Sequence, residues 1–97
     1  SCNQNASNQK ILDKSTMAKV IADLQVEEVK VNNLNCDSYD SSQVALKYLK
    51  EKVFKKHNID SARFVNSFEY YTKNNGEIIK IYEDAIKILT PQNKKKP

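Results

Sequence analysis

Apolar residues recur at helical spacing in four stretches of the chain. In the first stretch, Met17, Val20, Ile21 and Leu24 follow at i, i+3, i+4 and i+7, which is the spacing of one helix face. Comparable stripes run through the other three stretches, and no alternating pattern long enough for a useful strand occurs. The pattern predicts an all-α fold, a small four-helix domain without a sheet. The predicted helices lie near residues 14–31, 40–57, 60–73 and 76–90.

A tight helical corner is predicted between the second and third helices. Asn58 stands where a helix end needs a residue with positive φ, and Asn is the usual choice after Gly. Asp60 can cap the next helix, and Ile59 between them offers apolar surface to fill the corner. Because so short a connection does not favour an antiparallel return, the two helices are expected to cross steeply.

The other helix ends also carry sequence signals. Asp13 or Ser15 can cap the first helix, and Ile11 and Leu12 precede it as a hydrophobic staple. The remaining signals are a capping box of Asp40 with Gln43, a cap at Asn75 and a stop at Pro91.

The fourth predicted helix is apolar over about half of its circumference, whereas an arc of ~100° is enough for a surface helix. Its expected core stripe consists of Ile78, Ile79, Tyr82, Ala85, Ile86 and Leu89. Ile81 and Ile88 widen that stripe, so the helix either packs on two sides or leaves an apolar strip for a partner. The candidate partner surface is formed by Arg63, Asn66, Tyr70, Ile81 and Ile88.

One acidic residue interrupts the apolar stripe of the first helix. Glu28 lies within the stripe that Val31 extends, which predicts a carboxylate at the edge of the core if the helix continues that far. A buried carboxylate needs hydrogen-bond donors. The expected donor is Tyr71 or Tyr82, or else lysine or backbone N–H groups of the 32–39 loop. This hydrogen bond would either link the first helix to the third and fourth helices in a purely structural role, or place the Glu28 carboxylate in a groove that binds a ligand or partner.

Charge and composition narrow the function classes. The net charge is +4, but Lys94, Lys95 and Lys96 supply three of those charges in the tail. With a single histidine, His57, a Cys/His zinc site is excluded. The chain has no Gly-rich phosphate loop or nucleophile elbow, so we expect neither an enzyme nor a cofactor. No run of ~18 apolar residues is present to span a membrane.

The N-terminus suggests an anchor. Cys2 follows a small residue and precedes a polar run, as in a mature bacterial lipoprotein, although a terminal cysteine after a cloning scar fits equally well. Cys36 lies in the predicted 32–39 loop, and pairing with Cys2 remains open. The expected organisation is a flexible tether over 1–12, a helical domain over 13–91 and a basic tail over 92–97.

Several strings resemble a small lipoprotein family of Bacteroidota, domain of unknown function 4296. They are Met17, Ile21–Leu24, Glu28, Val53–Ile59, Phe64, Ser67, Tyr70–Tyr71, Ile81–Glu83 and Leu89. The chain departs from the family pattern at Asn58, where Gly is frequent, and at Gln25, where His is frequent. The resemblance implies lipidation at Cys2. Since no acidic cluster follows Cys2, the domain is expected to face the periplasm, with the outer membrane favoured.

These observations favour a membrane-anchored binding or assembly module of the cell envelope with a protein partner. A chaperone-like holder of unfolded segments is the alternative. A helix-turn-helix nucleic-acid binder is a remote alternative, because the third helix offers Arg63, Asn66 and Lys73 but also Glu69. We expect no nucleic-acid partner, and the sequence identifies no small-molecule substrate.

Overall fold

The computed structural model describes residues 10–34 and 38–90, which form four helices and no strand. The helices are α2 (Lys14–Asn32), α3 (Tyr39–Lys56), α4 (Ser61–Lys73) and α5 (Glu77–Leu89). The predicted all-α fold is confirmed, and every predicted helix boundary lies within one residue of the observed one. Cys2, Cys36 and the basic tail lie outside the described residues.

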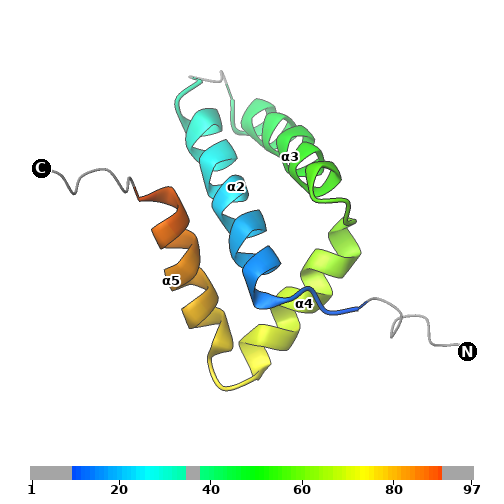
Figure 1. Ribbon diagram of the computed structural model, residues 1–97. Helices are drawn as coiled ribbons and strands as arrows, with labels where there is room; N and C mark the ends of the chain where they lie inside the picture. The colour runs from blue at the N-terminus through cyan, green and yellow to red at the C-terminus, as the bar shows by residue number, and fades with distance from the viewer. Residues whose placement is uncertain (1–9, 35–37, 91–97) are drawn as a thin grey trace, which may run out of the picture.

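The central helix of the fold is α2. Figure 1 shows α3 and α5 on either side of it, with α4 turning away from the end of α3 and crossing the lower end of the molecule. The short corner after α3 therefore changes the chain direction sharply, as its length predicts. An ion pair of Lys14 with Glu77 joins the N-terminal ends of α2 and α5. The hydrogen bond from Lys14 lowers the pKa of the Glu77 carboxyl.

The hydrophobic core lies around the N-terminal half of α2, where α4 and α5 both contact it. Met17 and Ile21 of α2 are buried there with Tyr71 of α4 and Ile81 of α5. The cluster also contains Leu12, Ala18, Ala22 and Ala85, with Ile59, Phe64, Phe68 and Ile78 packed against it. By contrast, α3 buries only Val53 among its residues and is the least embedded of the four described helices.

The residues before α2 form a strap across α4. The Leu12 side chain is only 3% exposed and belongs to the core cluster. Its N–H donates to Ser67 Oγ at 2.9 Å, and its carbonyl oxygen accepts from the Tyr71 hydroxyl at 2.7 Å. Arg63 Nε donates to the Lys10 carbonyl oxygen at 2.8 Å. The expected flexible tether over 1–12 is therefore wrong for residues 10–12, because the staple residue Leu12 anchors them to the core.

Three of the predicted helix-end signals are confirmed. The Asp13 side chain accepts from the Thr16 N–H and caps α2. Asp60 caps α4 in the same way, through the Arg63 N–H. Asn58 adopts a φ of 59°, the left-handed conformation that the tight corner requires.

Two other predicted caps are wrong. Ser38, and not Asp40, is the N-cap of α3, because its hydroxyl accepts from the Ser41 N–H and the helix begins one residue earlier. Gly76, and not Asn75, occupies the N-cap position of α5 and makes no side-chain cap bond. Asn75 itself adopts a φ of 55°, so it belongs to the turn before the helix.

Replacing Ser67 with Ala is expected to destabilise the fold by about 1–3 kcal/mol, because the buried Leu12 N–H loses its acceptor. Thr72→Ala is the matched control, since the Thr72 hydroxyl bonds only to the Phe68 carbonyl of its own exposed helix turn. That change is expected to stay within about 0.5 kcal/mol. Urea unfolding of both variants measures the difference. Equal stability of the two variants would show that the hydrogen bond between Leu12 and Ser67 contributes nothing.

Candidate functional site

The wide apolar arc of α5 is divided between core and surface. Ile81 is completely buried and Ala85 nearly so, because this side of the helix lies against α2. Ile79 and Ile86 are 61% and 60% exposed, although the spacing predicted them in the core stripe. Ile81, predicted as part of a partner surface, is therefore a core residue.

The exposed half of the arc forms a continuous apolar seam. Ile79, Tyr82, Ile86 and Leu89 are all exposed and stand at i, i+3, i+7 and i+10, so they share one face of α5. We call these four residues the α5 seam. The Tyr82 ring meets the Phe68 ring of α4 edge to face, with centroids 6.4 Å apart, so one edge of the seam is supported by α4.

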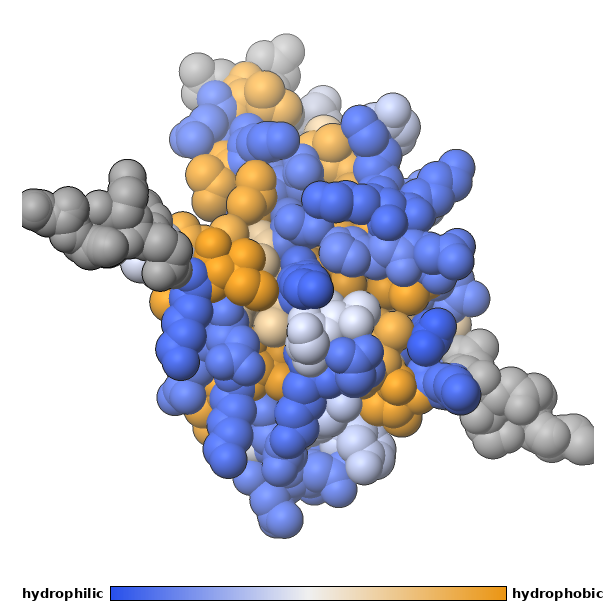
Figure 2. Space-filling model, in the orientation of Figure 1, coloured by the Kyte–Doolittle hydropathy of each residue, from blue (hydrophilic) through white to orange (hydrophobic). Residues whose placement is uncertain are grey.

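The apolar surface continues from α5 onto α2. Beside Leu89, a groove of about 390 Å³ is lined by Val26, Val29, Gln25 and Lys30 of α2. Both valines are exposed there. Figure 2 shows hydrophobic side chains gathered where the end of α5 meets α2, and mainly hydrophilic ones over α3. The end of the α5 seam thus opens into an apolar groove.

Of the other predicted partner-surface residues, three are exposed and Arg63 is partly covered. Arg63 is half-buried and binds the Lys10 carbonyl oxygen, so the strap covers part of this side of α4. Asn66 and Tyr70 are exposed, and the Tyr70 ring lies edge to face on Tyr71 with centroids 5.1 Å apart. Ile88 is also exposed, at the end of α5.

Glu28 is exposed, so the predicted buried tie to Tyr71 or Tyr82 is wrong. The Tyr71 hydroxyl binds the Leu12 carbonyl oxygen instead, and Tyr82 lies on the α5 seam. Helix α2 nevertheless continues to Asn32. The reason is the position of α4, whose residues cover Met17 and Ile21 but lie at the other end of α2 from Glu28.

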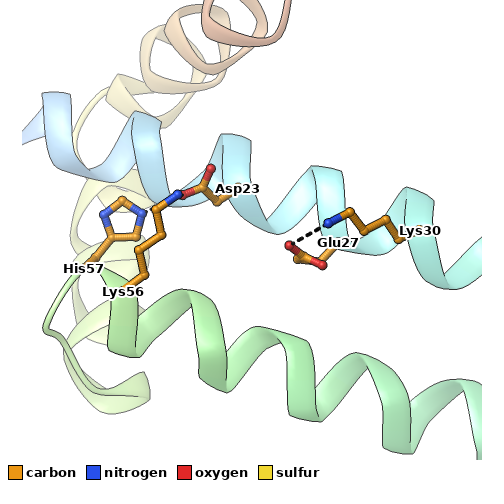
Figure 3. A network of polar contacts seen from close by, with 5 residues as sticks. All are labelled: Asp23, Glu27, Lys30, Lys56 and His57. Carbon is orange, nitrogen blue, oxygen red and sulfur yellow. Dashed lines mark hydrogen bonds and ion pairs between the residues drawn. The ribbon is translucent and has the colours of Figure 1, made fainter.

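A charged groove of about 370 Å³ separates α2 from the end of α3. His57 Nε2 lies 2.7 Å from Asp23 Oδ2, and Lys56 Nζ lies 3.2 Å from the same oxygen. Figure 3 shows the Lys56 and His57 side chains at the end of α3, next to the Asp23 carboxylate on α2. Burial alone would raise the pKa of Asp23, but the hydrogen bonds from His57 and Lys56 outweigh it and hold that pKa below its ordinary value. These contacts fasten α3 to the central helix.

Glu27 lies one turn further along the same groove. Its Oε2 is 3.6 Å from Lys30 Nζ, and its Oε1 is buried without a hydrogen-bond partner (Figure 3). In residues 10–34 and 38–90, no three His, Cys, Asp or Glu side chains come together in an arrangement that could hold a metal ion. The Lys56–Asp23 ion pair connects α3 to α2 across this groove. The residues that line the groove do not place a nucleophile beside a general base.

Removing the Asp23 charge is expected to cost stability in a pH-dependent way. A carboxyl with a lowered pKa contributes stability above its unfolded pKa, and that contribution is lost as the pH falls through the folded pKa. Asp23→Asn should therefore cost about 0.5–1.5 kcal/mol at neutral pH, and much less at an acid pH well below the ordinary aspartate pKa of about 3.9. Unfolding measured at both pH values tests this, with exposed Glu28→Gln as the control. A cost that does not change with pH would contradict the role of the Asp23 charge.

Sequence reasoning missed Asp23 as the partner of His57. The signal was faint. Asp23 lies at the edge of the α2 apolar stripe, where a polar residue can reach a neighbouring helix, but the neighbour depends on tertiary packing.

None of the helices in the described part of the chain is long and apolar enough to cross a membrane.

Comparison with known proteins identifies the family and nothing further. A family model described as Domain of unknown function (DUF4296) matches residues 9–95, so the chain belongs to this family. The family resemblance of the sequence strings is thereby confirmed. Searches of curated proteins and of solved structures gave no match.

Proposed function

We propose that this member of the DUF4296 family is a protein-binding module of the bacterial cell envelope, which holds a helix of a partner protein on its α5 seam. The single observation that carries the proposal is the exposure of that seam. Small soluble domains rarely leave a contiguous apolar patch without a function. Here large apolar side chains from about three turns of one helix are exposed, while Ile81 and Ala85 on the core side of the same helix are buried.

The spacing of the seam favours a helical occupant. Steps of three, four and three residues along α5 reproduce the a and d positions of a heptad repeat. A partner helix can therefore lay its own apolar stripe along Ile79, Tyr82, Ile86 and Leu89. The adjoining groove beside Val26 and Val29 offers room for one further apolar side chain. A second copy of this chain meets the same geometric requirement, so oligomeric state is part of the test.

The cellular setting rests on Cys2, which lies outside the described residues. We propose that Cys2 is the acylated residue of a lipoprotein and that the domain faces the periplasm, most simply from the outer membrane. A polar run after Cys2 fits such a tether.

Replacing Cys2 with Ser in the full-length precursor is expected to release the protein from the membrane fraction, because the acylated thiol is lost. Cell fractionation followed by detection of the protein measures this. The matched control is Ser1→Ala, which leaves the thiol in place. Unchanged membrane association of the Cys2→Ser protein would refute the anchor.

A further inference from the structure

The positive charge of the folded domain is concentrated on α3. This helix carries five lysines against Asp40 and Glu51, a net charge of +3, whereas α5 has a net charge of −1. The lysines are Lys47, Lys50, Lys52, Lys55 and Lys56. Because α3 and α5 lie on opposite sides of α2, the basic side of the domain is remote from the α5 seam (Figure 1).

The outer face of α3 combines this charge with exposed apolar side chains. Val44 and Tyr48, one turn apart, are 71% and 62% exposed. Lys52 follows one turn later, and its Nζ lies 5.7 Å from the centroid of the Tyr48 ring. An amphipathic tyrosine flanked by lysines is the composition that helices at a membrane interface use.

A groove of about 420 Å³ continues this face toward the α3–α4 corner. Tyr48, Phe54 and Ile59 supply its apolar lining, and Lys52 and Lys55 stand at its rim. Glu51, Asp60 and Ser61 also line it. The Asp60 carboxylate caps α4 by accepting a hydrogen bond from the Arg63 N–H, so one of its oxygens already has a partner within the protein.

The N-terminal strap enters the fold beside this corner. The Lys10 carbonyl oxygen is held by Arg63, which lies in the first turn of α4. A lipid tether that leads into the strap would therefore approach the molecule from the side of the α3–α4 corner.

We infer that the outer face of α3, with its adjoining groove, docks on an anionic phospholipid surface. Val44 and Tyr48 lie at the depth of the headgroups, and Lys52 and Lys55 pair with lipid phosphates. This contact adds an electrostatic attachment to that of the lipid anchor, and it turns the α5 seam away from the bilayer. The inference rests on the proposed envelope function for its cellular setting, but the soluble protein must bind vesicles without the Cys2 anchor, so the two can fail separately.

The test uses the full chain carrying Cys2→Ser, sedimented with phosphatidylcholine vesicles with and without about 30 mol % phosphatidylglycerol, a charge density that attracts basic surfaces. Binding to the anionic vesicles alone is expected, with loss near 1 M salt because ionic contacts are then screened. Since each lysine near such a surface contributes about fivefold in affinity, Lys52→Glu with Lys55→Glu should weaken binding at least tenfold. Tyr48→Ser should weaken it as well.

Lys80→Glu with Lys87→Glu on α5 is the matched control, because it makes the same charge change on the far side of the domain. This double variant should keep most of the binding, and its melting curve should match that of the parent protein. Equal loss with both pairs, equal binding to neutral vesicles, or displacement by inorganic phosphate at an ionic strength at which chloride leaves the protein bound would each overturn the inference. Displacement by phosphate would point instead to a site for a free anion.

Discussion

Replacing Ile81 with Ala is expected to destabilise the protein by about 2–5 kcal/mol, which is the range for large-to-small changes in a well-packed core. Ile81 is completely buried between α5 and α2, and it is among the largest fully buried side chains of the described residues. Its removal leaves a cavity next to Met17 and Tyr71, which the surrounding helices fill only in part. Differential scanning calorimetry measures the effect, and each kcal/mol corresponds to about 4–8 °C in a domain of this size.

The matched control is Ile79→Ala, which removes the same atoms from an exposed position of the same helix. Its stability is expected to stay within about 0.5 kcal/mol of the parent protein, since surface changes away from special features have little effect. If Ile79→Ala destabilises the protein as much as Ile81→Ala does, the seam is covered in solution, and the division of the α5 arc into core and surface is wrong.

Replacing both Ile79 and Ile86 with Ser is expected to weaken partner binding at least about 100-fold. Full burial of one isoleucine against a partner contributes about 1.5–3 kcal/mol, so losing two such contacts removes about 3–6 kcal/mol of binding free energy. Folding should be little affected, because both side chains are exposed in the free protein. Capture of the partner from detergent-solubilised envelopes, at a series of protein concentrations, measures the change.

Glu83→Ser with Asp84→Ser is the matched control for this experiment. Both residues are exposed on α5 but lie outside the seam. Their replacement should leave partner capture within a few-fold of the parent protein. A similar loss in both double variants would show that the loss of partner capture is not specific to the apolar seam.

Local signals in the sequence were sufficient to predict the helices. Apolar spacing depends only on the helix period, and Asp13, Asn58 and Asp60 act within a few residues of their own position. The predicted N-cap was wrong where several candidate capping residues stood close together in the sequence. Ser38 and Asp40 both qualify as caps for α3, and only the backbone conformation decides between them.

The surfaces were harder to predict, because they depend on which helices meet. An apolar arc spanning half of α5 does not indicate which part of it faces α2. Ile81 was therefore predicted on the surface and Ile79 in the core, and the structure shows the reverse. Glu28 continues the α2 stripe, but α4 crosses the other end of that helix and leaves it uncovered. The contact between Asp23 and His57 joins residues far apart in the chain, and no local pattern encodes it.

Site-specific photocrosslinking tests whether the α5 seam is the partner-binding surface. A photoreactive phenylalanine derivative placed at Ile86 or Ile79, one at a time, samples the seam in native envelopes, and the same residue at Asp84 samples the polar side of the helix. We expect one discrete adduct from the seam positions and none from position 84. A smear of many adducts would support a holder of unfolded clients, and an adduct of twice the chain mass would identify a second copy as the partner. No adduct from either seam position, or the same adduct from position 84, would contradict the claim.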